Sequence, residues 1–226
     1  MFLILARHGR TIANAAGVLA GRADGIALDA IGKDQVQSAG ERLADTTIAR
    51  IVSSPMQRCT ETAELLVPGR GVDLDDRLTE CDYGDWTGRT LAELAKEPLW
   101  RTVQRQPSAA TFPAGESMTE MSNRAVEAAR SLSREVAEAS GEHAVWLAVS
   151  HGDIIKAILA DALGMHLDSF QRISVNPASL SLIHYGNDRA SVLAMNTIAG
   201  ALPIPKVVSE DAAVGGTPEA TLGSQA

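Results

Sequence analysis

The sequence predicts an α/β protein whose central sheet contains buried, parallel strands. Short apolar runs without a polar break, such as Phe2–Ala6 and Val145–Val149, are typical of strands that are covered on both faces. Segments with helix-capping residues and one apolar face follow these runs, as expected for alternating strands and helices. A hydrophobic content of 45% in 226 residues is enough for one substantial core, so we expect a single domain over residues 1–201.

The first half of the chain contains further predicted helices and strands. Asp29 is suited to cap a helix over residues 30–44. The apolar residues of this helix that are spaced for one buried face are Ile31, Val36, Ala39 and Leu43. Residues 48–53 have the pattern of a second strand, and Ser54-Pro55 then offers a cap and a first-turn proline for the next helix. Residues 74–78 are a candidate for another strand.

The second half contains a long helix, a strand, a helix and a hairpin. Ser117 and Glu120 form a capping box for a helix that extends to about residue 139. Its predicted buried residues are Met118, Met121, Ala125, Ala128, Ala129, Leu132 and Val136. The strand at 145–149 precedes a helix that ends near Leu163, where Gly164 can terminate it. The stretches 180–185 and 190–195 flank a Gly-Asn-Asp turn and predict a closing β-hairpin.

Composition limits the kinds of partner and the cellular location. The formal charge of −8 and a pI near 5.1 argue against a nucleic-acid or anionic membrane surface, because both need a positive field. No segment resembles a signal peptide or a membrane span, so a cytoplasmic protein is expected. Cys59 and Cys81 are too few for a disulfide framework and are expected to be buried, reduced thiols. From residue 202 the composition shifts to Pro, Gly, Ser, Ala and acids, which predicts a disordered tail over 202–226.

The first strand delivers a group of residues suited to phosphoryl chemistry. Arg7, His8 and Gly9 follow the apolar run and should lie at the carboxyl end of the sheet, where α/β proteins bind ligands. The planar donors of Arg7 suit a phosphoryl group, and a neutral imidazole at His8 is a competent nucleophile toward phosphorus near pH 7. Gly9 would let the backbone approach the ligand closely.

Two later segments place comparable residues at the same edge of the sheet. Arg58 falls in the first turn of a predicted helix, a position that suits an anionic ligand better than a solvated arginine. His151 and Gly152 follow the strand at 145–149 and repeat the pattern of the opening segment. His143, His166 and His184 lack such a context, and none is expected to be a ligand.

These motifs resemble those of the histidine phosphatase superfamily, the phosphoglycerate mutase-like proteins. The resemblance rests on Arg7-His8-Gly9 with Asn14, on the Ser-x-Pro-x-x-Arg-x-x-x-Thr-Ala pattern at 53–63, on the Leu-x-Glu-x-x-x-Gly-x-Trp-x-Gly pattern at 78–88, and on His151-Gly152. All of these blocks occur in order between about residues 2 and 198. The resemblance implies a three-layer α/β/α sandwich with a mostly parallel central sheet.

The resemblance also implies a mechanism and a set of site residues. The family's nucleophile corresponds to His8, its proton donor to Glu80, and its groups that stabilise the phosphoryl charge to Arg7, Arg58 and His151. Phosphate or substrate contacts are expected from Asn14, Gly9, Thr11 and Gly152. Asp82 is the nearest rival for the role of Glu80. The sequence shows no metal-ligand cluster, and the expected mechanism needs neither a metal nor another cofactor.

Three readings of the function stay open at this point. Hydrolysis of small phosphorylated metabolites is favoured over a phosphoglycerate mutase-type reaction, because Asp82-Tyr83-Gly84-Asp85 replaces the more basic and hydrophobic sequence of the mutases. A binding module without turnover is the third reading, disfavoured because every catalytic residue is present. The variable stretch 91–115 should decide the substrate. A homodimer is possible, and Cys59 and Cys81 could lie near the pocket wall as a redox-sensitive pair.

Overall fold

The protein, described here by a computed structural model, folds around one six-stranded sheet with the strand order β3-β2-β4-β1-β5-β6. The structure describes residues 1–200, 202 and 204. The strands are β1 (Phe2–Arg7), β2 (Ile48–Ser53), β3 (Asp73–Leu74), β4 (Val145–Ser150), β5 (Leu180–Tyr185) and β6 (Ala190–Thr197). The α-helices are α1 (Ile12–Ala15), α2 (Ala30–Glu41), α3 (Gln57–Leu66), α4 (Leu91–Leu94), α5 (Pro98–Arg105), α6 (Met118–Ser140) and α7 (Gly152–Ala162). Apart from residues 202 and 204, the predicted disordered tail lies outside the described residues.

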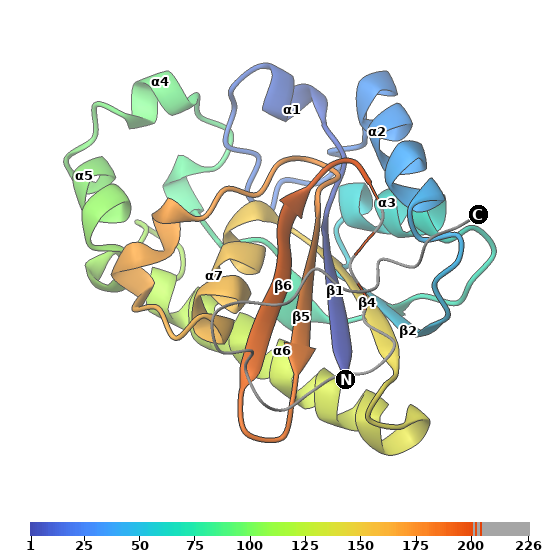
Figure 1. The fold of residues 1–226 in the computed structure, drawn as a ribbon. Coiled ribbons are helices and arrows are strands. Elements are labelled where there is room, and N and C mark those ends of the chain that lie inside the picture. Colours follow the sequence, from blue (N-terminus) through green and yellow to red (C-terminus); the bar gives the residue numbers. More distant parts are fainter. Residues whose placement is uncertain (201, 203, 205–226) are drawn as a thin grey trace.

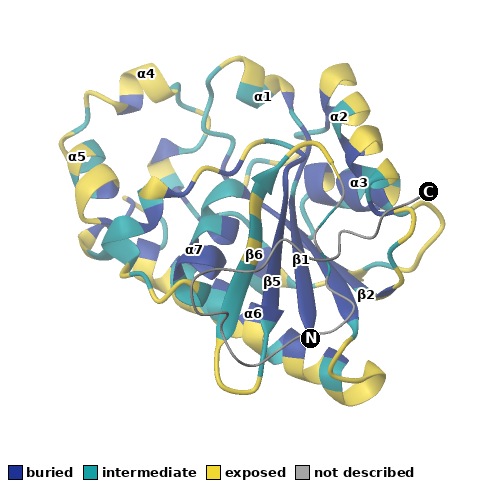
Figure 2. Cartoon of the chain, in the orientation of Figure 1, coloured by how far each residue is buried: buried dark blue, intermediate teal, exposed yellow. Residues whose placement is uncertain are grey.

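The sheet lies between two layers of helices, which confirms the predicted three-layer arrangement. Helices α2 and α3 cover one face, and α6 and α7 cover the other (Figure 1). Alternate residues of β1 enter the two cores: Leu3 and Leu5 pack on the α6–α7 side, whereas Ile4 and Ala6 pack on the α2–α3 side. Figure 2 shows β1 and β5 buried along their length and β6 at the sheet edge only partly buried. None of the described helices combines the length and apolar character of a membrane span.

The register of the parallel strands brings their carboxyl ends to one place. Strand β1 pairs with β4 so that Arg7 lies opposite Ser150, and β2 pairs with β4 so that Ser53 lies opposite Val149. The residues that follow these strands therefore share one edge of the sheet. Strands β5 and β6 are antiparallel and form the predicted hairpin, which continues the sheet beyond β1.

Several predicted helix features are confirmed. Ser117 and Glu120 form the capping box of α6, and every apolar residue predicted to lie on its inner face is buried. Asp29 caps α2 by accepting a hydrogen bond from the Gly32 amide. Gly164 follows the end of α7 with a positive φ of 65°, a conformation that favours glycine.

Three predictions about local structure are wrong. Ile31 is 49% exposed, because the buried face of α2 runs through Gly32, Val36 and Ala39. Helix α3 begins at Gln57 instead of directly after Ser54, whose hydroxyl lies 2.8 Å from a histidine nitrogen. The stretch 74–78 contributes only the last residue of β3, and residues 76–78 form a 3₁₀ turn capped by Asp75.

We predict that Gly32→Ala destabilises the protein although alanine is the better helix former. A Cβ atom at this position would overlap the Arg10 carbonyl oxygen, so α2 would have to move away from the segment that follows β1. We expect a loss of about 2 kcal/mol in the free energy of unfolding, measured by urea denaturation, as for other overpacked sites. Ser38→Ala, at an exposed position of the same helix, is the matched control and should leave stability unchanged or raised. A Gly32→Ala protein as stable as the control would contradict this account.

Candidate active site

A cavity of about 470 Å³ lies at the carboxyl ends of the parallel strands. Most of the residues predicted to form the site contribute to its wall. Those residues are Arg7, His8, Thr11, Asn14, Arg58, Glu80 and Gly152. The structure thus brings together groups from β1, α1, α3, α7 and the loop that carries Glu80.

His8 is held in one orientation and one charge state. Its side chain is 3% exposed, and Nδ1 lies 2.8 Å from the Gly9 carbonyl oxygen, which can only accept a hydrogen bond. Nδ1 therefore carries the proton, and Nε2 presents a lone pair. Burial and the nearby charges of Arg7 and Arg58 hold the pKa of His8 well below its usual value. The imidazole is thus neutral and nucleophilic across the physiological pH range.

The two cavity arginines each retain a buried donor without a partner. Arg7 donates from Nη1 to the Val175 carbonyl oxygen at 2.6 Å, and Arg58 donates from Nη2 to the Gly21 carbonyl oxygen at 2.8 Å. Arg7 Nε and Arg58 Nη1 find no hydrogen-bond acceptor among the described residues. A buried donor left without a partner costs roughly 1–3 kcal/mol, so both groups favour an anion in the cavity.

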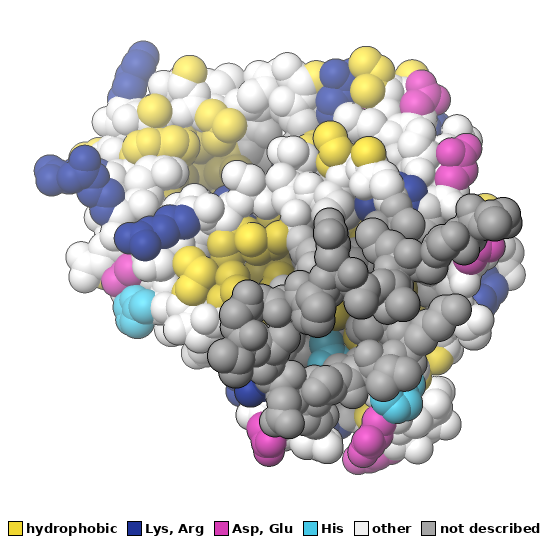
Figure 3. Space-filling view, in the orientation of Figure 1, with side chains coloured by type: hydrophobic (Ala, Val, Ile, Leu, Met, Phe, Trp, Pro, Cys, Tyr) yellow, Lys and Arg dark blue, Asp and Glu magenta, His cyan; other side chains and the backbone are white. Residues whose placement is uncertain are grey.

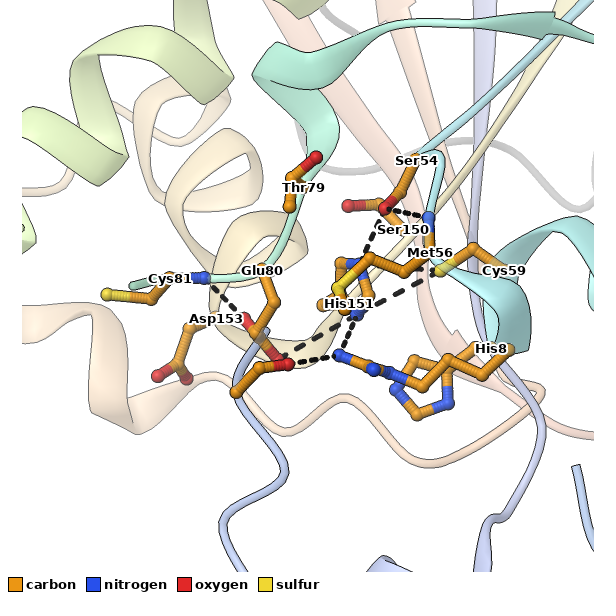
Figure 4. Close-up of polar contacts among 12 residues, drawn as sticks. His8, Ser54, Met56, Cys59, Thr79, Glu80, Cys81, Ser150, His151 and Asp153 are labelled. Carbon is orange, nitrogen blue, oxygen red and sulfur yellow. Dashed lines mark hydrogen bonds and ion pairs between the residues drawn. The ribbon is translucent and has the colours of Figure 1, made fainter. Parts of the chain in front are cut away.

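His151 lies deeper than the other predicted site residues. It is fully buried and is not among the residues that line the cavity. Arg58 Nη2 donates to its Nδ1 at 3.1 Å, and Nε2 lies 2.8 Å from the Ser54 hydroxyl (Figure 4). The ring lies 5.3 Å from that of His8, centroid to centroid. His151 therefore helps to hold the guanidinium group of Arg58 in place.

Gly9 is packed closely against α2 and α3. It does not line the cavity, and its amide donates to the Thr62 hydroxyl at 3.1 Å. A Cβ atom on Gly9 would crowd the Gly32 carbonyl oxygen at 2.6 Å and the Val36 side chain at 2.7 Å. The absence of a side chain therefore allows the close approach of α2 to the end of β1.

Glu80 has the properties of a proton donor at neutral pH. Burial and the nearby carboxylate of Asp153 raise its pKa to about 7. Asp153 stands in the first turn of α7 and accepts a hydrogen bond from the Tyr83 hydroxyl at 2.9 Å. In Figure 4, Glu80 lies between Asp153 on one side and His151 on the other. Asp82, the rival for this role, is absent from the cavity wall and lies 3.8 Å from Arg22.

A network of charged residues fixes the loop that carries Glu80. Arg124 of α6 donates to the main-chain oxygens of Thr79 and Glu80 at 2.7 and 3.1 Å. It also forms a two-pronged ion pair with Glu116, with distances of 2.6 and 3.0 Å. Arg22, which lies in the segment between α1 and α2, donates to the same main-chain oxygen of Glu80 at 2.8 Å. The backbone position of the acid is thus set by arginines that the sequence analysis did not select.

Sequence reasoning also missed part of the cavity wall. Asp153, Lys156, Gln171 and Asn176 line the cavity, and none of them was chosen as a site residue. Of these four residues, only Asp153 could have been selected from the sequence, because it lies two residues after His151 in the first turn of a predicted helix. The others come from segments whose position depends on the fold.

The two cysteines are buried and lie outside the cavity wall. Cys59 and Cys81 are buried free thiols and do not line the cavity wall, and Cys59 Sγ lies 3.4 Å from His151 Nε2. Burial raises the pKa of Cys59 to about 12, so this thiol stays protonated. No group of three or more His, Cys, Asp or Glu side chains suited to a metal ion occurs among residues 1–200, 202 and 204.

A sequence model of the histidine phosphatase superfamily (branch 1) matches residues 3–198. The chain belongs to this superfamily. The chain is similar to a protein named probable phosphoglycerate mutase GpmB from Proteus mirabilis, with 34% identity over 81% of this chain and 84% of that one. It is also similar to glucosyl-3-phosphoglycerate phosphatase from Mycolicibacterium vanbaalenii, with 32% identity over 74% of this chain and 76% of that one.

A solved structure of a phosphatase has the same fold. The alpha-ribazole phosphatase from Shigella flexneri superimposes with a TM-score of 0.77 and 27% identity, covering 88% of this chain and 98% of that one. The predicted family and fold of this histidine phosphatase are therefore confirmed. The sequence relatives carry both kinds of name, mutase and phosphatase.

For this histidine phosphatase we predict that Asp153→Asn shifts the alkaline limb of the pH profile to lower pH. Glu80 must be protonated to donate, so kcat/KM falls as pH rises through its pKa of about 7. Removing the negative charge of Asp153 makes the Glu80 carboxylate less unfavourable and lowers that pKa. The measurement is kcat/KM against pH with one substrate, so that ionisation of the substrate is common to both proteins. Asp85→Asn, the same change at an exposed position outside the cavity, should leave the profile in place; an unmoved limb in Asp153→Asn would refute the coupling.

We further predict that Arg58→Lys lowers kcat/KM by about 100-fold or more, because lysine cannot supply both the donor toward the cavity and the hydrogen bonds to Gly21 and His151. Steady-state kinetics give the loss, and circular dichroism verifies the fold. Arg89→Lys is the control, since Arg89 pairs with Glu97 away from the cavity wall. Equal activity of the two variants would show that Arg58 is not a phosphate ligand.

Proposed function

We propose that this protein hydrolyses phosphate monoesters through a phosphohistidine formed on His8. The observation that carries the proposal is the neutral imidazole of His8 beside two buried, unpartnered donors on Arg7 and Arg58. A nucleophile and preorganised cationic donors are the two requirements of phosphoryl transfer without large rearrangement.

In the first half-reaction, His8 Nε2 attacks phosphorus and the bond from phosphorus to the ester oxygen breaks. The electron pair leaves on that oxygen, which takes the proton of Glu80 and departs as an alcohol. The donors of Arg7 and Arg58 hold the equatorial oxygens, whose negative charge they offset. The α7 N-terminus at Gly152 adds a favourable dipole on the same side of the cavity.

In the second half-reaction, water attacks the phosphohistidine while the Glu80 carboxylate accepts its proton. The bond from phosphorus to Nε2 breaks, inorganic phosphate leaves, and His8 and Glu80 return to their starting states. A pKa of about 7 suits Glu80 to both duties near neutral pH. In this scheme His151 acts on the reaction by holding Arg58, and Thr11 and Asn14 line the phosphate end of the cavity.

A mutase reaction is the alternative that the relatives named GpmB favour. A mutase must keep water from its phosphohistidine and return the phosphoryl group to the substrate, whereas a phosphatase needs only access for water. The Asp82-Tyr83-Gly84-Asp85 stretch after Glu80, in place of the mutases' more basic and hydrophobic sequence, supports hydrolysis. A small phosphorylated metabolite as substrate, a cytoplasmic location and a homodimer remain predictions.

We predict that His8→Ala releases at least about 1000-fold less inorganic phosphate than the intact protein, because the nucleophile is lost. The assay uses a panel of phosphate monoesters that includes 3-phosphoglycerate. The intact protein alone should also form an acid-labile, alkali-stable phosphoenzyme, as expected for phosphohistidine. His143→Ala, at an exposed position, is the matched control. Conversion of 3-phosphoglycerate to its isomer without phosphate release would instead establish a mutase.

A further inference from the structure

One part of the cavity wall is formed by apolar side chains. The side chains that form this part, which we call the apolar wall, are Leu19, Trp86, Leu91, Trp100, Val103 and Phe112. They come from the segment after α1, from the Trp86 turn, from α4 and α5, and from the loop before α6. Figure 3 shows hydrophobic side chains gathered in the hollow over α4 and α5.

The apolar wall contains a layered aromatic group. Trp86 stacks on Trp100 with ring centroids 6.1 Å apart and an interplanar angle of 27°. Phe112 meets Trp86 edge to face at 5.2 Å, and Tyr83 meets Phe112 in the same way at 5.0 Å. Trp86 and Phe112 are buried, whereas Trp100 remains partly exposed and lines the cavity. Trp100 therefore offers a flat ring that is already fixed by its neighbours.

The same region has little capacity to bind a second anion. Apart from Arg7 and Arg58, the only Lys or Arg side chain on the described cavity wall is Lys156. Its ammonium group donates to Asp153 and to Gln171, both at 3.1 Å, and lies 5.5 Å from the centroid of the Phe170 ring. A carboxylate on the leaving group would have to compete with Asp153 for this charge. The ion pair therefore disfavours substrates that carry an acid beside the phosphate.

We propose that the alcohol released by this enzyme is uncharged and bears a flat ring that stacks on Trp100. This inference rests on the proposed phosphatase function and deepens it. A three-carbon acid would leave most of the 470 Å³ cavity unfilled, and apart from Arg7 and Arg58, which the phosphate occupies, the described cavity wall offers its carboxylate no unpaired cation. A ring-bearing alcohol fills the space and buries apolar surface, while the exposed Gln104 remains to bind a polar substituent.

The test compares esters of primary alcohols, so that leaving-group chemistry is nearly constant: ethyl phosphate, benzyl phosphate, 2-naphthylmethyl phosphate and 3-phosphoglycerate. We expect kcat/KM for phosphate release to be at least about tenfold higher for the naphthylmethyl ester than for 3-phosphoglycerate. Trp100→Ala should lower the ratio of naphthylmethyl to ethyl activity by about tenfold, and Trp100→Phe should restore most of it. Arg101→Ala, at an exposed position of α5 outside the cavity wall, should leave the ratio unchanged.

The outcomes separate this inference from the proposed function. Release from all esters with a preference for 3-phosphoglycerate, or an unchanged ratio in Trp100→Ala, would overturn the ring-bearing leaving group and keep the phosphatase. Lys156→Met then adds a second criterion, because a selective loss of 3-phosphoglycerate activity would identify Lys156 as a carboxylate receptor and refute the charge argument. No release from any ester would overturn both proposals.

Discussion

The constraint on which the rest of the site depends is a pair of neighbouring arginine side chains at the end of the sheet, the buried Arg58 and the partly buried Arg7. Their mutual repulsion and lost hydration are unfavourable, and burial already lowers the pKa of Arg7. The fold offsets part of this cost with main-chain carbonyl oxygens from the segments at Gly21 and Val175. One donor on each arginine is still left for an incoming anion. In a chain with a net charge of −8, this pocket is a local reversal of the overall field.

The surroundings of these two arginines shift the pKa values of the neighbouring histidines and of Glu80 in opposite directions. Burial, together with these cations, lowers the pKa values of His8 and His151, which favours the neutral form of both imidazoles. Glu80 lies near them as well, yet burial and Asp153 outweigh their influence and raise its pKa. A neutral nucleophile and an acid that still holds its proton up to about neutral pH therefore coexist within one cavity. Environment, and not residue type, assigns the two roles.

The features that the sequence predicted are those encoded locally. The strand at Val145 and the cap at Ser117 depend on residues next to each other, and both are confirmed. The exposure of Ile31 was not predicted, because the inner face of α2 begins at Gly32. Glycine has no side chain, so a pattern of hydrophobic residues cannot show that this position is buried. The place of His151 and the influence of Asp153 on Glu80 could not be predicted, since both depend on segments far apart in the chain. The motifs selected residues that mostly line one cavity, but they could not show which of these residues lie deeper than the others.

Helices α4 and α5, which contribute Leu91 and Trp100 to the cavity wall, lie in one continuous segment between the Glu80 loop and α6. The cavity residues Arg7, Arg58 and Gly152 come from β1, α3 and α7, outside this segment. Most of the apolar wall therefore comes from one stretch of about two dozen residues, which is separate in the sequence from Arg7, Arg58 and Gly152. A relative with a different sequence in this stretch can bind a different substrate and still keep the residues at the carboxyl ends of the strands.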